Sequence, residues 1–468
     1  MGFKKLFGKN IEVVNIGLES FKDDLTKQGE KVTNVEWTPP ANLDKNVLQI
    51  LKTNEAKINK ANEKVLEIIL NGKPYLVGLD IARNVIPGMK ENLLLHSGPP
   101  ITWDRMCGPL KGAMIGAMIY EGKSKDFDEA DKLGASGKFD FAPCHEHDTV
   151  GPMAGVVSAS MPVFVLKNQE YGNFAYCTLN EGLGKVLRYG AYDKDTITKL
   201  KWMENELYPT LKKAVEFNGK IDLKNIIAQA LHMGDEVHNR NRAATSLFYR
   251  IIAPAIVQSC KEPEVTAKVL NFINGNDHFF LNLSMPAAKV TLDAARNIKN
   301  SSIVIAMTRN GTDFGLQLAG TENSWFVGEA LVPDALYFPG FTKDDANPDI
   351  GDSSITETVG LGGFAIAASP AIVQFVGGSA SDAVNYTMTM YEIAFGENNI
   401  YQIPYLNFRG TPTGIDVTKV VEKGILPFID TGVAHKNPGI GQVGAGVLSA
   451  PMPPFVKAAT GLAEQLKK

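Results

Sequence analysis

Residues 11–37, with the sequence IEVVNIGLESFKDDLTKQGEKVTNVEW, decide the fold class. Ile11–Leu18 is a short run rich in β-branched residues, Glu19–Gln28 has a helical pattern, and Lys31–Trp37 alternates like a strand before two prolines end it. A strand, a helix and a second strand in succession are typical of an α/β layer. The sequence therefore predicts an α/β layer at the N-terminus.

Outward from this stretch, the hydrophobic pattern continues to alternate between helix and strand. Residues 196–254 are dominated by helical patterns, and we predict one continuous helix over Leu223–Pro254 because breakers are few there. Further helices are predicted at residues 42–71 (in two pieces), 115–120, 262–274 and 287–298, and strands at residues 73–80, 279–283, 302–308 and 314–318.

These elements predict a multi-domain α/β protein that is α+β overall. The pattern changes near residues 170 and 258. We therefore expect an N-terminal α/β domain over residues 1–170, a mainly helical domain over residues 171–258, and a Gly-rich C-terminal α+β domain over residues 259–468.

Composition narrows the class of protein. The chain has 468 residues and a net charge of −4 from 47 basic and 51 acidic side chains, and no basic stripe argues for nucleic acid as a partner. The longest uncharged run, Thr358–Ser381, is rich in Gly, Ala and Ser, so we expect it in a buried core and not in a membrane. Four cysteines without CxxC spacing, and an N-terminus without an apolar signal region, predict a cytoplasmic protein without a disulfide framework.

The nine residues Gly234–Arg242 (GDEVHNRNR) crowd charged and amide side chains together. On the helix predicted there, Asp235, His238, Asn239 and Arg242 stand at positions i, i+3, i+4 and i+7 and share one face. An acid, an imidazole, an amide and a guanidinium on one stripe can bind a small planar anion. The alternative is a solvated helix face with ordinary ion pairs.

A second dense motif is Cys144–Asp148 (CHEHD), which flanking Pro and Gly residues place in a loop. His145, Glu146 and His147 are candidate acid–base groups, because histidine titrates near neutral pH. The two histidines are also a candidate metal pair that an acidic side chain would complete. Adjacent loop residues point in different directions, so at most two or three of these side chains can converge, and a polar surface loop is the alternative.

Three further polar loops follow strands or precede helices, which is where anionic ligands commonly bind. A guanidinium in such a loop binds carboxylate or phosphate with two parallel hydrogen bonds. The alternative for each loop is a solvated turn or a surface ion pair. The candidate substrate-binding residues in them are His96, Arg105, Asn180, Glu181, Arg309 and Asn310, with Lys185 and Arg188 adding charge to the second loop.

Gly439–Gly444 matches the GxGxxG pattern literally. The match lies too close to the end of the sequence for a βαβ unit and its acidic residue to follow, so we reject a dinucleotide site and expect no cofactor. Two other interpretations of this segment stay open: a Gly-rich loop that wraps a small ligand, and one that caps a subunit contact.

With these motifs in hand, the chain resembles one bacterial family along nearly its whole length. The family comprises the YahG- and YlbE-like proteins, which accompany FdrA-type proteins. At least one of its branches is a subunit of oxamate carbamoyltransferase, which converts oxalurate and phosphate into oxamate and carbamoyl phosphate at the end of allantoin breakdown. The segments that carry the resemblance are Asn15–Glu19, Val35–Pro40, His96–Ile101, Cys144–Asp148, Asn180–Gly182, Gly234–Arg242 and Met307–Gly311.

The resemblance implies a carbamoyltransferase subunit in purine nitrogen catabolism that binds a small carboxylate or phosphate anion. Its implied partners are FdrA-like and other subunits of a heteromeric complex, and a homo-oligomer is expected as well. We expect His145 or His147 to carry the acid–base role. Around the substrate we expect Arg105 and Arg309 as anion clamps, and Asp235, His238 and Arg242 as lining of the pocket.

Two other classes stay open at this point. A metal-dependent amidohydrolase would use the loop His145–Asp148, and stoichiometric zinc would favour it. A non-catalytic subunit would shape an FdrA-containing complex without touching the substrate.

Overall fold

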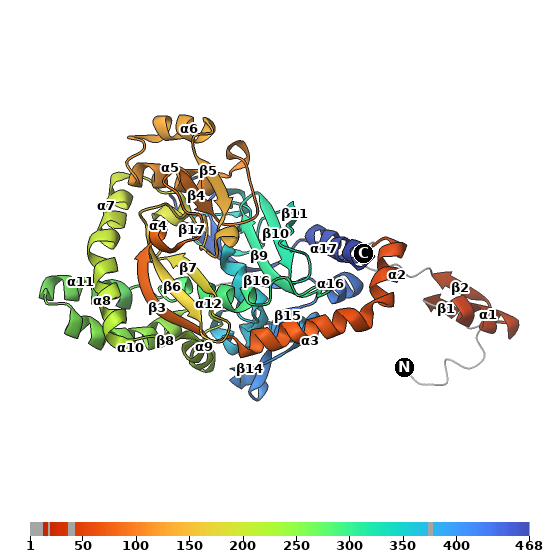
Figure 1. Ribbon diagram of the computed structural model, residues 1–468. Helices are drawn as coiled ribbons and strands as arrows, with labels where there is room; N and C mark the ends of the chain where they lie inside the picture. Colours follow the sequence, from red (N-terminus) through yellow and green to blue (C-terminus); the bar gives the residue numbers. More distant parts are fainter. Residues whose placement is uncertain (1–12, 17–18, 36–42, 373–377, 468) are drawn as a thin grey trace.

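The computed structural model describes residues 13–16, 19–35, 43–372 and 378–467. The chain is a mixed protein of helices and several small sheets, α+β overall, as the sequence predicts (Figure 1). None of the helices within these residues is long and apolar enough to span a membrane.

The strand–helix–strand opening is confirmed. Strand β1 (Val13–Ile16), helix α1 (Glu19–Lys27) and strand β2 (Val32–Val35) follow one another, and the two strands pair in parallel with Val13 beside Val32. A parallel pair needs a crossover connection, which α1 supplies. This unit lies at the right edge of Figure 1.

Helices α2 (Lys45–Thr53) and α3 (Glu55–Asn71) confirm the two-piece helix predicted for residues 42–71. The buried Asn62 of α3 donates a hydrogen bond to Oγ of Ser302 at 2.8 Å. This bond ties the N-terminal helices to the C-terminal half of the chain.

A four-stranded antiparallel sheet forms the centre of the N-terminal half, in the order β7-β6-β3-β8. Helix α12 (Leu281–Asp293) packs against three of its strands. The sheet contains strands from both sides of the predicted boundary at residue 170. The strands are β3 (Pro74–Ile81), β6 (Pro162–Asn168), β7 (Phe174–Thr178) and β8 (Ile221–Asp222).

Strands β4 (Leu93–His96) and β5 (Asp140–Pro143) form a separate parallel pair in which His96 lies beside Pro143. The carboxyl ends of both strands therefore lie together, so the loops that begin at residues 97 and 144 are neighbours. Helices α4 (Ala82–Val85), α5 (Gly108–Tyr120) and α6 (Phe127–Ala135) precede or connect the two strands.

The central helical region is confirmed, but the prediction of one helix over Leu223–Pro254 is wrong. Residues 233–241 form a loop between two helices, and Gly234 and Val237 in it have φ angles of +94° and +67°. A right-handed helix does not allow positive φ. The helices are α7 (Lys194–Trp202), α8 (Tyr208–Asn218), α9 (Leu223–His232), α10 (Arg242–Ser259) and α11 (Pro263–Asn274), with a π-helical turn at Met203–Leu207.

The strand predicted at residues 279–283 is wrong as well, because this run leads into helix α12. Phe279 stacks on Phe248 with ring centroids 5.8 Å apart and meets Phe164 edge to face at 6.0 Å. A short apolar run fits a buried helix or a strand equally well, and its packing partners decide between them.

In the C-terminal part, the strands predicted at residues 302–308 and 314–318 are confirmed as an antiparallel pair, β9 and β10. They form the centre of the sheet β11-β10-β9-β13, and the sheet β12-β17-β16 and the hairpin β14–β15 lie beyond it. The strands are β9 (Val304–Asn310), β10 (Asp313–Leu318), β11 (Phe326–Glu329), β12 (Leu336–Tyr337), β13 (Ile350–Gly351), β14 (Ala394–Ile403), β15 (Arg409–Ile415), β16 (Phe428–Ala434) and β17 (Gln442–Ser449).

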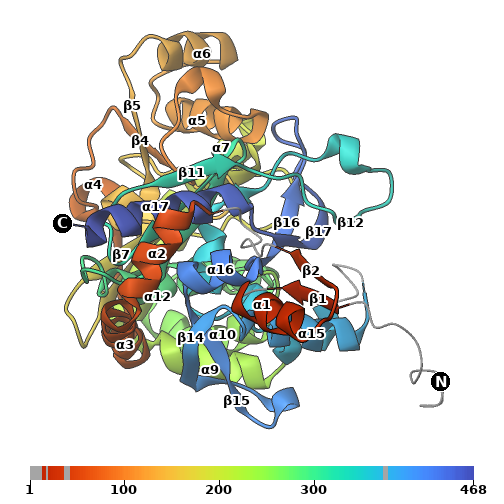
Figure 2. The same cartoon turned by 90° about the vertical axis from the view of Figure 1, so that its right-hand side faces the viewer.

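Within the described residues, four helices accompany these strands. Two of them, α16 and α17, lie against each other, and α17 also contacts α2 (Figure 2). The helices are α13 (Ile355–Thr358), α15 (Ala380–Met390), α16 (Val417–Lys423) and α17 (Met452–Leu466).

The largest hydrophobic core runs from Val65 of α3 to Ala434 of β16. Val237 of the loop between α9 and α10 is fully buried in it. Burial of apolar surface is the main stabilising term in folding. The loop is therefore anchored in the core, although most of its side chains are polar.

Candidate functional site

The loop at residues 233–241 is held by two buried carboxylates that bind its own backbone. Oδ2 of Asp235 accepts the N–H of Ala244 at 2.9 Å, in the first turn of α10. The carboxylate of Glu236 accepts the N–H groups of His238 at 2.7 Å and of Arg240 at 2.5 Å. Buried carboxylates that accept several N–H donors fix a backbone firmly. The loop therefore presents His238, Asn239 and Arg240 in defined positions.

His238 also contacts a buried acid from another part of the chain, Glu357. Its Nδ1 lies 2.7 Å from Oε1 of Glu357 in α13, and both side chains are almost fully buried. The same Oε1 accepts the backbone N–H groups of Gly363 and Asp430, each at 3.0 Å. Glu357 thus joins the loop, the Gly-rich segment after α13 and strand β16 at one oxygen atom.

Asn239 contacts a third acid, since its Nδ2 donates to Oδ1 of Asp430 at 3.0 Å. Burial, followed by repulsion from Asp430, raises the pKa of Glu236 well above its ordinary value, and burial also raises the pKa of Asp430. Burial raises the pKa of Asp235 to about 6. The loop therefore lies on a cluster of buried carboxyl groups that hold protons more tightly than free ones.

A cavity of about 350 Å³ opens beside this loop. The loop and the start of α10 form one wall, and the Gly-rich segment that leads into β17 forms the other. A much smaller recess adjoins the cavity and shares Asn239, His278 and Gln442 with it; its other lining residues include Arg188, His238 and Ser353. The cavity is large enough for small organic anions.

Guanidinium groups give this space its chemistry. Arg188 is 5% exposed; its Nη2 donates to the carbonyl of Gly182 at 2.6 Å, while its Nε has no hydrogen-bond partner among the described residues. Nε of Arg240 lies 3.4 Å from Oδ1 of Asp235 and also has no hydrogen-bond partner within that part of the chain. Arg242 lies at the start of α10 with a largely exposed side chain. Buried N–H groups without acceptors favour the binding of an anion.

His278 lines both the cavity and the recess. Burial, and then the positive charges of Arg188 and His238, lower the pKa of His278 to about 3. The ring is therefore neutral at physiological pH and offers one donor and one acceptor. The cavity thus contains cationic groups together with a neutral imidazole.

The motif Cys144–Asp148 does not converge on one point. His145 is fully buried, and its Nε2 lies 3.7 Å from Oδ1 of Asp352. Nδ1 of His147 lies 2.6 Å from the carbonyl of Pro87, and Glu146 accepts the indole N–H of Trp325 at 2.9 Å. Burial raises the pKa of the Cys144 thiol well above its ordinary value. Neither a nucleophilic thiolate nor a metal-ligand set follows from this arrangement.

No other set of metal ligands forms in the part of the chain that the structure describes. Within residues 13–16, 19–35, 43–372 and 378–467, no three His, Cys, Asp or Glu side chains gather as metal ligands.

Most of the other predicted substrate-binding residues make internal contacts away from the cavity. Arg105 pairs with Asp313 at 2.7 Å, and Arg309 is fully buried and pairs with Asp349. Nδ1 of His96 lies 2.7 Å from the carbonyl of Ser97, and burial lowers the pKa of His96 to about 4. Asn310 donates to the carbonyl of Pro99, and Asn180 donates to Oδ1 of Asn282.

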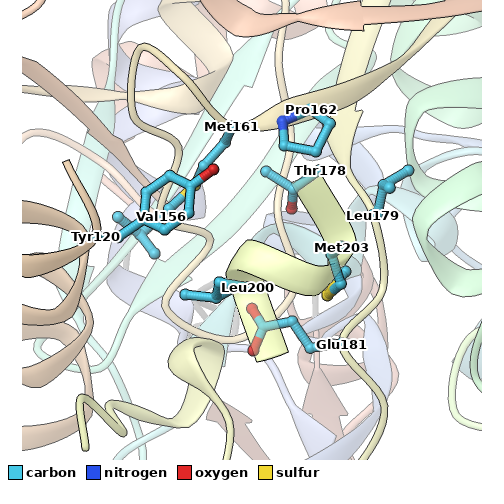
Figure 3. A pocket seen from close by; sticks show the side chains of 9 residues that line it. All are labelled: Tyr120, Val156, Met161, Pro162, Thr178, Leu179, Glu181, Leu200 and Met203. Atoms are coloured by element: carbon cyan, nitrogen blue, oxygen red, sulfur yellow. The ribbon is translucent and has the colours of Figure 1, made fainter. Parts of the chain in front are cut away.

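Glu181 lines a separate, small cavity together with Tyr120, Thr178 and Met203 (Figure 3). Its volume is about 20 Å³, which is room for about one water molecule. Burial raises the pKa of Glu181, while Arg188 opposes the shift. This cavity is too small for an organic substrate.

The structure thus brings together three of the predicted residues, His238, Asn239 and Arg242, with Asp235 directly behind them. Sequence reasoning missed Glu357, Asp430 and His278 in this site, and it did not assign Arg240 or Gln442 to it. One signal was present, because the literal GxGxxG match contains Gln442 and borders the cavity.

A family model and two relatives point to one family. Residues 139–353 match the family described as "Oxamate carbamoyltransferase subunit AllG". The chain is 45% identical over 467 residues, 99% of both chains, to "Uncharacterized protein YahG" of Escherichia coli (strain K12). It is 43% identical over 412 residues, 87% of this chain and 98% of the relative, to "Oxamate carbamoyltransferase subunit AllG" of the same strain.

A solved structure agrees with the fold. It is a crystal structure of a conserved protein of unknown function from Enterococcus faecalis V583, with 48% sequence identity and a TM-score of 0.86. The match covers 88% of this chain and 98% of that one. Identity at this level along nearly the whole sequence shows that the chain belongs to the family of YahG and of the oxamate carbamoyltransferase subunit AllG.

Proposed function

We propose that this chain is a subunit of a carbamoyltransferase that converts oxalurate and phosphate into oxamate and carbamoyl phosphate, in the catabolism of allantoin nitrogen. The relative that is named as such a subunit is 43% identical over 412 residues. The observation that carries the proposal is the cavity beside residues 233–241, which Arg240 and Arg242 line and which adjoins the recess with Arg188.

Both proposed substrates are small anions that need such donors. Oxalurate has one carboxylate, and phosphate at neutral pH is a mixture of the monoanion and the dianion. Arg188 and Arg240 each have a buried Nε without a hydrogen-bond partner in the described ranges. A guanidinium binds carboxylate and phosphate with charge-assisted hydrogen bonds. In the proposal one anion lies in the cavity and extends toward Arg188 at the recess, which alone has a volume of about 20 Å³, and Arg240 and Arg242 bind the other nearer the mouth.

The reaction requires a proton to move. A phosphate oxygen forms a bond to the carbamoyl carbon, and the bond between this carbon and the oxamate nitrogen breaks. The proton that hydrogen phosphate loses balances the one that the oxamate nitrogen gains. An imidazole can carry it, since histidine both accepts and donates protons near neutral pH. His238 lines the recess and has this role in the proposal.

Among the residues suggested by sequence, the proposal therefore retains His238, Asn239 and Arg242, with Asp235 as the acid that holds the loop. His145 and His147 are not assigned the acid–base role, because their side chains point to different internal partners. The proposed chemistry uses side chains of the chain and no cofactor.

The proposed setting is a heteromeric complex. The 43% identical relative is named as a subunit. In the proposal, the complex includes FdrA-like and other subunits, this chain forms a homo-oligomer within it, and the enzyme acts in the cytoplasm.

The test is phosphate-dependent formation of carbamoyl phosphate from oxalurate, coupled to carbamate kinase and ADP. We expect activity from the chain together with its partner subunits. His238→Gln in this complex should lower the rate by roughly 10²–10⁴-fold, the usual contribution of an acid–base group. The matched control is Arg105→Ala, which removes an ion pair outside the cavity and should leave the rate unchanged.

Two results would overturn the proposal. An assembled complex that forms no carbamoyl phosphate from oxalurate rules out this reaction. An active complex whose rate is unaffected by His238→Gln and Arg188→Ala, with both variants folded, makes this chain a non-catalytic subunit.

A further inference from the structure

The carboxylate of Glu357 can act only as an acceptor at the atom that faces His238. Its Oε1 accepts two backbone N–H groups, from Gly363 and Asp430, each at 3.0 Å. Oγ1 of Thr356 lies 3.0 Å from its Oε2. Glu357 is fully buried, so these donors replace water around it. A backbone N–H cannot accept a proton, and Oε1 is therefore committed as an acceptor.

The acceptor role of Oε1 determines which ring nitrogen of His238 carries the hydrogen. Nδ1 lies 2.7 Å from Oε1 of Glu357, a distance that requires a hydrogen between them. Because Oε1 accepts, Nδ1 must donate. A neutral imidazole has only one N–H, so Nε2 is then left with a free lone pair. His238 lines the recess that contains Arg188 and Ser353.

We infer that Glu357 is a positioning residue that holds His238 with a hydrogen on Nδ1 and so makes Nε2 the proton-transfer atom of the recess. The identity of the proton donor and acceptor rests on the proposed function, whereas the tautomer does not. Nε2 takes the proton that hydrogen phosphate loses as its oxygen bonds to the carbamoyl carbon. It returns this proton to the oxamate nitrogen as the carbon–nitrogen bond breaks.

The other charged groups around the ring come from several elements. Glu236 of the same loop accepts the backbone N–H of His238, and Asp430 of β16 lies close enough for His238 to oppose the rise in the Asp430 pKa. The positive charge of His238 also contributes to the low pKa of His278. Unlike Glu236 and Asp430, Glu357 contacts the ring of His238 itself.

The first test needs no variant of Glu357. In ¹⁵N-histidine-labelled full-length chain, the ring nitrogens of His238 are assigned by their loss in His238→Gln. Protonated and unprotonated ring nitrogens have well separated ¹⁵N shifts. Above the pKa of His238 we expect the hydrogen on Nδ1, whereas free histidine in water carries it mainly on Nε2. A hydrogen on Nε2 in the folded chain overturns the inference.

The second test measures the charge. Glu357→Gln keeps the shape but removes the negative charge, so the pKa of His238 in the NMR titration should fall by one unit or more. In the assembled enzyme, kcat should fall at least tenfold while KM for phosphate changes less than twofold, because the anion-binding arginines are untouched. An unchanged pKa and kcat overturn the positioning role.

The matched control is Glu121→Gln. Glu121 also accepts a backbone N–H, from Ser160, and a hydroxyl, from Ser158, but it lies among residues that do not line the cavity. It should leave the tautomer, the pKa of His238 and kcat unchanged. A hydrogen on Nδ1 in a complex that makes no carbamoyl phosphate would support the positioning role and overturn only the proposed reaction.

Discussion

Arg309 and Asp349 form a two-pronged ion pair in the interior of the protein. Nε of Arg309 lies 2.6 Å from Oδ2 of Asp349, and Nη2 lies 3.0 Å from Oδ1. The same guanidinium donates to the carbonyl of Gly351 at 2.6 Å and to Oγ1 of Thr431 at 3.1 Å. All its contacts connect β9 to β13 and β16. A guanidinium that sequence alone offers as an anion clamp is therefore occupied in holding two sheets together.

This arrangement predicts a stability effect. Arg309→Met should lower the free energy of unfolding by about 3–5 kcal/mol, because it leaves Asp349 buried without its partner. Chemical denaturation at neutral pH measures the change. Arg105→Met is the control: Arg105 is half exposed and pairs with Asp313, so its loss should cost less than about 1 kcal/mol. Equal losses from the two variants would contradict the structural role of Arg309.

The fold was predictable where the pattern is local. Strands β9 and β10 and helices α2 and α3 follow from hydrophobic periodicity, because each element shows its own period in its own residues. The loop between α9 and α10 was not predictable in this way. The spacing of its polar side chains suits a helix face, but Asp235 and Glu236 bind the backbone N–H groups of the loop and of α10 and stabilise a different path.

The site was predictable only in part, for a related reason. The density of polar residues identified His238 and Asn239 from sequence. Their partners come from far along the chain: Glu357 is 119 positions from His238, and Asp430 is 191 positions from Asn239. Pairings at such separation leave no local pattern. The loop at residue 145 shows the opposite error, since a dense motif there dispersed into separate contacts.

His145 should tolerate an apolar replacement. It is fully buried, neither ring nitrogen has a hydrogen-bond partner among the described residues, and burial lowers its pKa well below the ordinary value. Replacing an unsatisfied buried polar group by an apolar one is nearly neutral or stabilising. His145→Leu should therefore change the unfolding free energy by less than about 1 kcal/mol and leave the carbamoyl transfer rate intact.

Denaturation and the coupled assay on the same preparation check this prediction. His238→Leu, measured in parallel, should lose the activity. If His145→Leu keeps its stability but loses activity, His145 regains the acid–base role that its motif suggested.

The arginines of the cavity should rank by burial in phosphate affinity. Arg188 is nearly fully buried, Arg240 is about 30% exposed at its side chain and Arg242 about 70%. Hydrogen bonds to charged groups contribute about 1.5–3 kcal/mol when desolvated. Arg188→Ala should thus weaken phosphate binding by roughly 10–100-fold, Arg240→Ala less, and Arg242→Ala by only a few-fold.

Calorimetric titration with inorganic phosphate at fixed ionic strength gives the order. The effect of Arg242→Ala should shrink further as salt rises, because an exposed charge is screened. Equal effects from all three variants would mean that general charge, and not a buried contact, binds the anion. Affinity unchanged by Arg188→Ala would remove the recess from the binding site.

Asp352 should make the protein less stable as pH rises. Burial raises the pKa of this carboxyl to about 6, although Thr308 and the backbone N–H groups of Gly98 and Gly151 oppose the shift. The unfolded value is near 4. Between these values the folded chain binds the proton more tightly than the unfolded chain, so protonation favours folding. The contribution of Asp352 is then largest near pH 4 and is lost by about pH 7.

The size of the expected change in unfolding free energy distinguishes the titration of Asp352 from that of other groups. A shift of about two pKa units corresponds to roughly 2–3 kcal/mol. Between pH 4 and pH 7, the unfolding free energy of Asp352→Asn should therefore fall by about 2–3 kcal/mol less than that of the parent chain. Asp382→Asn is a control of opposite sign, because hydrogen bonds from Ser379 lower the pKa of Asp382 and its charge stabilises the cap of α15 as pH rises. Parallel curves for the parent and Asp352→Asn would mean that Asp352 is ionised throughout, with its three hydrogen-bond donors outweighing the cost of burial.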